Sequence, residues 1–342
     1  MRHQTPAQGL RGPDLCPATV VSASRKPDPL ALHLQIARRS GALSVLIGLL
    51  IAVGSLIGGF AAMGGHVAVL WQPWELVIIL GTAIGTYFVA NPMKTVTDTG
   101  TAVMEALRNT APSQAHYFEV LGVLYALMRE LRNKGRAEIE QHIETPYESA
   151  LFAAYPGVLA DTQVTTFICD YFRLIIVGKA QAHEVEALLD EEIGSHFQDR
   201  LKPYYALGTV SEALPALGIV AAVLGVIKAM GAIDQSPALL GGFIGAALVG
   251  TFAGIFFSYG VIGPISLKIK AVREKQLRVY IVVKQTLLAF INGAAPQVAL
   301  EYGRKVISAA ERPSIDEVED KTISGAGQRA APANDRAQKE AA

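Results

Sequence analysis

Long stretches without charged side chains are the feature that most limits what this 342-residue sequence can fold into. Residues 42–63 and 76–93 form two such stretches, separated by a Gly-, Gln- and Pro-containing segment that is typical of a turn. Residues 235–267 form another. Because a helix needs about 20 apolar residues to cross a bilayer, each stretch predicts a membrane span.

A fourth span is predicted within residues 205–230, although its uncharged part, 213–227, is shorter. Glu212 and Lys228 bracket that part, so we expect these two charges at the two membrane interfaces. Trp71 and Trp74 precede the second span, where amphipathic rings favour the headgroup level. The spans therefore come in chain order as two hairpins.

Basic residues predict the orientation of these hairpins. The loops 64–73 and 231–237 carry no Lys or Arg, whereas the opposite ends of the spans are basic. The basic residues at those ends are Arg38, Arg39, Lys94, Lys202, Lys268 and Lys270. Since cytoplasmic loops are enriched in Lys and Arg, we expect both termini and the long middle region on the cytoplasmic side of the membrane.

The predicted fold class is all-α: a polytopic membrane protein with four transmembrane helices and a large helical cytoplasmic domain. Apolar positions at helical spacing, such as Val120, Leu124 and Leu127, support the helical domain. The predicted segments are a disordered extension (1–40), a transmembrane hairpin (41–93), the helical cytoplasmic domain (94–204), a second hairpin (205–267), a cytoplasmic helical region (268–312) and a flexible tail (313–342).

Composition and motifs disfavour several function classes. The formal net charge is zero, so nucleic acid is not an expected partner, whereas 51% hydrophobic residues make membrane lipid one. Cys16 and Cys169 stand far apart without a Cys/His cluster, so no metal site is expected. The sequence contains no phosphate-binding loop and no HExxH motif. We therefore expect neither enzymatic activity nor a cofactor.

The interiors of the four spans contain no Asp, Glu, Lys, Arg or His. Proton relays normally need a titratable group inside the membrane, so an ion path here would require an acid from a partner. Thr251, Ser258 and Tyr259 could line such a path with hydroxyl groups. The alternative is that these hydroxyls only bond to the backbone of their own helix.

Two further features have both a functional and a plain structural interpretation. Arg129, Arg132, Arg136 and Glu140 recur at helical spacing and could dock a charged partner, but from spacing alone a solvated helix face is the favoured interpretation. Pro215 and Pro264 lie near the same membrane face, where they could form a hinge or merely mark helix ends.

Several segments, in order along the chain, resemble the MotA family of flagellar stator subunits, within the MotA/TolQ/ExbB proton channel family. WQPWELVII at 71–79 resembles the start of the second span of that family, and ALPALGIVAA at 213–222 its third span. VGTFAG at 249–254 resembles the fourth span, EALLDEE at 186–192 a cytoplasmic helix, and ERPS at 311–314 the end of the family region. The resemblance covers about 45–320.

The resemblance implies partners and residue roles. Members pair with MotB, which supplies the membrane aspartate, and assemble as a homo-oligomer, a pentamer. By motif, Arg132 and Glu140 match the residues that engage the rotor protein FliG, and Pro215 and Pro264 match the prolines that couple ion flow to a conformational change. Ala222 stands where sodium-type relatives favour a hydroxyl, so the resemblance implies protons as the ion.

Three alternatives remain open from the sequence. A sodium-type stator shares most of these motifs. An ExbB/TolQ-like energy-transducing channel subunit usually has three spans, so the hairpin 42–93 argues against it. A structural membrane scaffold would need neither an acid nor a partner.

The charge asymmetry yields a topology prediction. We expect a reporter fused after Gln72 to be active as a periplasmic fusion, because the loop containing Gln72 lacks Lys and Arg. Reporters near Gln141 and Gln328 should behave as cytoplasmic. Paired alkaline phosphatase and fluorescent fusions measure this, and a periplasmic signal at Gln141 would overturn the orientation.

Overall fold

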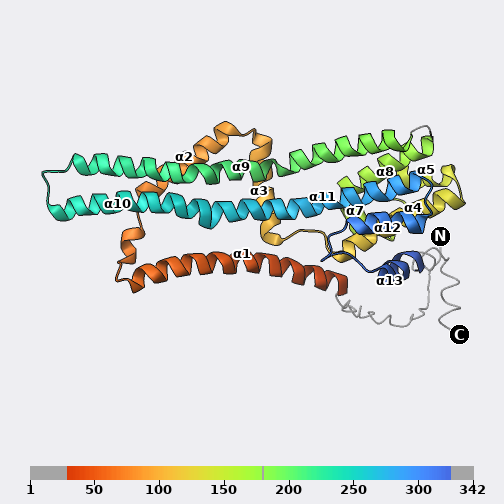
Figure 1. Cartoon of the computed structure of the whole chain (residues 1–342), viewed down its shortest axis with the longest axis horizontal. Helices are drawn as coiled ribbons and strands as arrows, with labels where there is room; N and C mark the ends of the chain where they lie inside the picture. Colours follow the sequence, from red (N-terminus) through yellow and green to blue (C-terminus); the bar gives the residue numbers. More distant parts are fainter. Residues whose placement is uncertain (1–28, 179–180, 325–342) are drawn as a thin grey trace, which may run out of the picture.

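The computed structural model describes residues 29–178 and 181–324, and the described elements are helical throughout. Four helical stretches are long and apolar enough to cross a membrane. The predicted fold class, an all-α protein with four spans and a large helical region, is confirmed. Figure 1 shows an elongated molecule, with the turn between the two longest helical stretches at one end and a cluster of shorter helices at the other.

The elements follow one another with short connections. The α-helices are α1 (Pro29–Ala62), α2 (Pro73–Ala90), α3 (Met93–Arg108), α4 (Gln114–Asn133), α5 (Arg136–Glu144), α6 (Ala150–Ala153), α7 (Pro156–Ala160), α8 (Thr162–Val177), α9 (Ala182–Met230), α10 (Pro237–Phe256), α11 (Gly263–Ile291), α12 (Pro296–Val306) and α13 (Ile315–Val318). A 3₁₀ turn, η1 (Val67–Leu70), precedes α2, and π-helical turns form η2 (Phe257–Ile262) and η3 (Glu319–Ser324).

Two uninterrupted helical stretches extend from the predicted membrane spans into the large helical region outside them. Helix α9 has 49 residues, and α10, η2 and α11 follow one another without a gap from Pro237 to Ile291. At 1.5 Å per residue, each is about 70–80 Å long, more than twice the thickness of the hydrocarbon core of a bilayer. The predicted segment boundaries at 204/205 and 267/268 therefore fall inside continuous helices.

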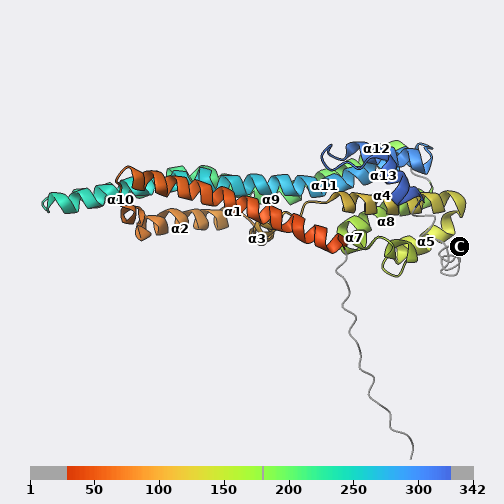
Figure 2. The same ribbon diagram turned by 90° about the horizontal axis from the view of Figure 1, so that it is seen from below.

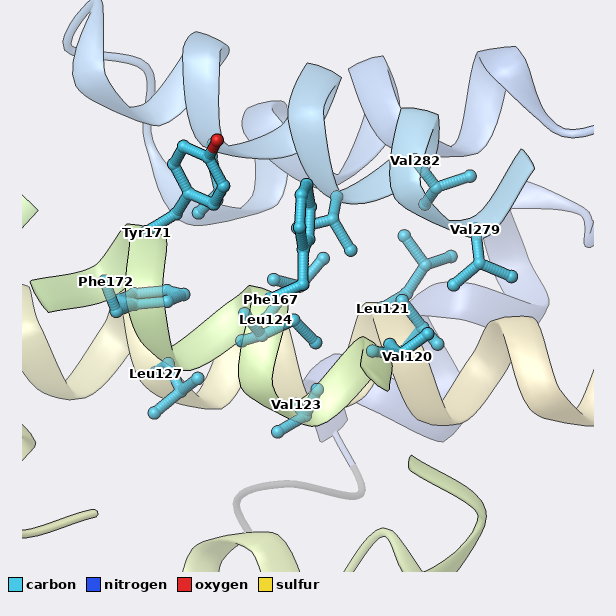
Figure 3. Close-up of a cluster of buried hydrophobic side chains, with 14 of the residues drawn as sticks. Val120, Leu121, Val123, Leu124, Leu127, Phe167, Tyr171, Phe172, Val279 and Val282 are labelled. Atoms are coloured by element: carbon cyan, nitrogen blue, oxygen red, sulfur yellow. The ribbon is translucent and has the colours of Figure 1, made fainter. Parts of the chain in front are cut away.

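The large helical region outside the spans has one large hydrophobic core. Val120, Leu124 and Leu127 of α4 are fully buried, so the apolar stripe seen in the sequence is the face that packs inward. They meet Phe167 of α8 and Val282 of α11 in this core (Figure 3). Because α11 and the start of α9 contribute directly to the core, this helical region is built around the ends of the long helices.

The chain is ordered beyond the predicted start of the flexible tail at residue 313. Residues up to Ser324 form α13 and η3, where Val318 is 5% exposed within the core and Lys321 Nζ lies 4.3 Å from the ring centre of Phe118. Burial of the apolar Val318 side chain offsets the conformational entropy that is lost when this segment becomes ordered. A wholly polar tail would lack that gain. The rest of the predicted tail, 325–342, lies outside the described residues.

Helix α1 also differs from the sequence-based boundaries. It begins at Pro29, so its first turns include residues that were assigned to the disordered extension; residues 1–28 of that extension lie outside the described residues. Its apolar part, Leu43–Ala62, has no buried residue within this chain, and α1 runs obliquely across the other long helices (Figure 2). That surface is left for lipid or neighbouring subunits.

A buried arginine joins helix α11 to helices α3 and α9. Arg273 of α11 is 0% exposed and donates hydrogen bonds of 2.7 Å to both carboxylate oxygens of Asp98 on α3. It also bonds Glu105 of α3 at 3.1 Å and the carbonyl of Arg200 on α9 at 2.7 Å. Burial tends to raise the pKa of Asp98, but the hydrogen bonds and charge of Arg273 outweigh it and hold the pKa below 3.8.

This cluster yields a stability prediction. Asp98→Asn should destabilise the protein at pH 7 by about 1–2 kcal/mol, because it weakens a largely buried ion pair that water still partly screens. The pKa of Asp98 is lower in the folded protein than in the unfolded chain. Its contribution to the free energy of unfolding is therefore full above about pH 4, and it is lost as the pH falls through the pKa of the folded state. The difference between wild type and variant should therefore shrink in acid.

Thermal unfolding of the detergent-solubilised protein at several pH values measures this difference. Asp199→Asn is the matched control, because Asp199 pairs with Lys202 on an exposed helix face. Equal melting temperatures for the two variants at pH 7 would contradict a stabilising role for the buried cluster.

Candidate functional site

Helices α9 and α10 approach so closely that their backbones touch. A Cβ atom added to Gly254 would lie 2.6 Å from the carbonyl oxygen of Leu214 and 2.8 Å from Cα of Gly218. One added to Gly250 would lie 3.3 Å from Cβ of Ala221. Small residues at such positions allow membrane helices to pack at short range. The GxxxG spacing of Gly250 and Gly254 thus corresponds to a real helix contact.

The candidate ion-path residues lie at or beside this contact. Ala222 belongs to α9, and its backbone nitrogen lies 3.6 Å from the Cβ position of Gly250. Thr251 follows Gly250 on α10, is half-buried, and its hydroxyl forms no hydrogen bond with any residue that the structure describes. The Thr251 hydroxyl is therefore available to water or to a carboxyl group on another helix.

The two other predicted hydroxyl residues are placed differently. Tyr259 is 74% exposed on the isolated chain, so it can face a partner. Ser258 is 1% exposed, and its hydroxyl donates a 2.6 Å hydrogen bond to the carbonyl of Ser211 on α9. Ser258 therefore joins two helices instead of lining an open path.

The two predicted coupling prolines interrupt the helices in different ways. Pro215 lies inside α9, which continues through it, whereas Pro264 comes directly after the π-helical turn η2, at the start of α11. Ser211 of α9 contacts Ser258 of η2, so the two irregular regions meet at one level of the helix pair. The structure thus brings the proline-bearing segments together, as their shared membrane face had suggested.

The predicted rotor-facing residues lie far from the membrane contact. Arg132 is in the last turn of α4 and Glu140 is on α5, near the end of the molecule opposite the α9–α10 turn (Figure 1). Both are exposed, and neither forms an ion pair or hydrogen bond with any residue in the described part of the chain. Gly135, with φ of +94°, makes the turn between the two helices.

Some of the charges around this corner are paired. Lys134 contacts Glu130 and Glu138 at 3.2 Å each, and hydrogen bonds with these carboxylates raise the pKa of Lys134. Nε2 of His142 lies 3.3 Å from Glu130. The exposed and unpaired side chains of Arg132 and Glu140 are therefore left free to meet charges on another protein.

The sequence analysis missed two clusters that the structure reveals. One is the buried Arg273 cluster. The helix 268–291 contains several charged residues, and nothing in the sequence distinguishes the buried Arg273 from the exposed ones. The other is the Ser211–Ser258 pair. A signal for it exists, since Ser211 precedes Pro215 by four residues and its carbonyl therefore lacks the usual helical donor. No group of three or more potential metal ligands occurs among residues 29–178 and 181–324.

Known families match most of this architecture. The family described as "Motility protein A N-terminal" matches residues 46–135, and the "MotA/TolQ/ExbB proton channel family" matches residues 159–280. A motility protein A of Salmonella typhimurium is 42% identical over 276 residues, which cover 81% of this chain and 94% of the relative. The chemotaxis protein LafT of Vibrio parahaemolyticus is 34% identical over 273 residues, covering 80% and 96%.

Solved structures support the same fold. The C. jejuni MotAB structure matches with a TM-score of 0.65 and 20% identity, covering 80% of this chain and 98% of that chain. The flagellar MotAB stator complex from Bacillus subtilis matches with a TM-score of 0.61 and 21% identity, with the same coverage.

The fold and the family matches define a four-span helical membrane protein of the MotA/TolQ/ExbB proton channel class. Within that class, the chain belongs to the motility protein A family. The resemblance noted in the sequence is thereby confirmed.

The close helix contact yields a packing prediction. Gly254→Ala should destabilise the protein by about 1–3 kcal/mol, because the methyl group would overlap the carbonyl of Leu214 and force α9 and α10 apart. Gly241→Ala on the same helix is the matched control, since a Cβ there meets nothing within 4 Å. Melting temperature in detergent and protein level in membranes measure the effect, and equal values for the two variants would contradict it.

Proposed function

We propose that this chain is a subunit of a flagellar stator that, together with a MotB protein, conducts protons across the bacterial inner membrane and turns their flow into torque on the rotor. The observation that carries the proposal is an incomplete ion path. Helices α9 and α10 place Ala222 and Thr251 at a tight contact, yet the span interiors contain no Asp, Glu, Lys, Arg or His.

A partner with a membrane carboxylate completes that path. Relatives of this chain include proteins named motility protein A, and its structural neighbours are MotAB structures. We propose that MotB supplies the aspartate and that the free hydroxyl of Thr251 hydrogen-bonds to water or to the protonated carboxyl group. Ala222, which adds no hydroxyl to the path, favours protons over sodium.

The long helices support a route from ion path to rotor. Because α9 and the α10–α11 stretch run from the membrane into the cytoplasmic core, a change in their crossing at Pro215 and Pro264 also moves the cytoplasmic domain. Arg132 and Glu140 at the far end of that domain are the proposed contacts with FliG. Opposite charges on the rotor would steer and orient this contact.

The exposed apolar surface supports assembly. The first span contributes no buried residue within one chain, so it must be covered by lipid or by neighbouring subunits. We propose a homo-oligomeric ring, a pentamer, around the MotB helices. Both termini and the domain between the hairpins then lie on the cytoplasmic side, where the rotor is.

An ExbB/TolQ-like role is the second candidate, because the matched family includes those proteins. The first hairpin disfavours it. That hairpin lies in the segment matched by the N-terminal family of motility protein A, and the 42% identity to the Salmonella relative extends over 94% of that relative.

Complementation of a motile host whose own stator subunit is deleted tests the function. The wild-type chain, expressed with its MotB, should restore swimming, and Arg132→Glu should lower swimming speed roughly tenfold because reversing a docking charge disfavours the rotor contact. Its level in membranes and its co-purification with MotB should not change. A compensating charge reversal on FliG should restore part of the speed.

Lys305→Glu is the control, since Lys305 is an exposed basic residue on α12, outside the α4–α5 corner. Failure of the wild-type chain to restore swimming would reject the stator function. Equal effects of the two charge reversals would reject only the rotor contact.

A further inference from the structure

Two buried serines exchange hydrogen bonds between the two proline-bearing helices. Ser258 Oγ donates to the carbonyl oxygen of Ser211 at 2.6 Å, and Ser211 Oγ donates to the carbonyl oxygen of Ser258 at 2.9 Å. The two hydroxyl oxygens lie 3.4 Å apart. Ser211 is 8% exposed and Ser258 is 1% exposed, so the exchange occurs out of contact with water.

The position of Pro215 explains why the carbonyl of Ser211 needs such a donor. In an α-helix, that carbonyl would accept from the backbone N–H four residues later, which is the position of Pro215. Proline has no N–H, so the carbonyl is left without its helical partner. The hydroxyl of Ser258, from the opposite helix, takes the place of the missing donor.

The other half of the exchange lies in the π-helical turn that precedes Pro264. The carbonyl of Ser258 accepts from the backbone N–H of Gly263, five residues later, and also from Ser211 Oγ. The backbone at Gly263 is close as well, since a Cβ there would lie 3.3 Å from Ser211 Oγ. At this level α9 lacks one backbone donor and η2 has a π-helical turn, and the affected carbonyl of each is bonded to a serine of the other.

We propose that Ser211 and Ser258 are positioning residues for coupling: they form a pivot that stays closed while the helices bend at Pro215 and Pro264. Parting the pair would leave the carbonyl of Ser211 without a donor and two hydroxyl groups without acceptors in a buried site. Bending around a closed pivot keeps every one of these bonds. The parts of the two helices inside the membrane, α10 and the second half of α9, can then change their tilt. The parts outside the membrane, α11 and the first half of α9, move with them as rigid levers.

The inference rests on the proposed stator function, and hydroxyl-specific variants test it. Ser258→Ala and Ser211→Ala should each lower swimming speed roughly twofold or more, with unchanged membrane level and MotB co-purification. The double Ala variant should lose less than the product of the two single effects, because the two serines act as one unit. Thr, which keeps the hydroxyl, should recover most of the speed in at least one of the two positions.

Ser266→Ala is the matched control. Ser266 is 3% exposed on α11 and forms no hydrogen bond with a described residue, so its removal should leave speed unchanged. Wild-type speed in both single Ala variants, or Thr variants as slow as Ala at both positions, would overturn the pivot. Loss of both Ala variants from the membrane would make the pair structural and also overturn it. If the wild-type chain itself fails to restore swimming, the stator function fails instead.

Discussion

The backbone contact between α9 and α10 is the constraint on which the rest of the structure depends. With a Cβ position at Gly254 only 2.6 Å from the carbonyl of Leu214, no side chain fits between the two helices at this level. Apolar lipid provides no hydrophobic force between helices, so such short-range packing and buried hydrogen bonds are what hold a membrane pair together. The Ser211–Ser258 exchange continues the contact toward the cytoplasmic side.

That contact matters for function because both helices continue far beyond the bilayer. Moving one charge through 100 mV releases about 2.3 kcal/mol, whereas leaving a buried polar group unpaired costs about 1–3 kcal/mol. In the proposed cycle, breaking several buried hydrogen bonds would therefore cost more than the free energy that one charge releases. A bend that preserves these hydrogen bonds would leave that free energy available to move α11 and the first half of α9.

The large helical domain contacts the long helices at two places. The hydrophobic core incorporates residues of α11, such as Val282, beside those of α4 and α8. The buried Arg273 joins α11 to α3 through Asp98 and Glu105, close to where the first hairpin ends. Arg132 and Glu140, the proposed rotor contacts, lie near the far end of this domain, where the proposed movement of the long helices would produce its largest displacement.

The sequence by itself determined the four spans, the helical class and the family, because uncharged runs and long motifs report local chemistry directly. Its assignment of functional roles to Pro215, Pro264, Arg132 and Glu140 stays a prediction. Only the tertiary structure decided that Ser258 bonds to Ser211, that Arg273 is the buried charge of its helix, and that residues 313–324 pack on the core. The physical reason is that hydrogen-bond partners and burial depend on which distant segments meet, and one sequence without those contacts does not specify them.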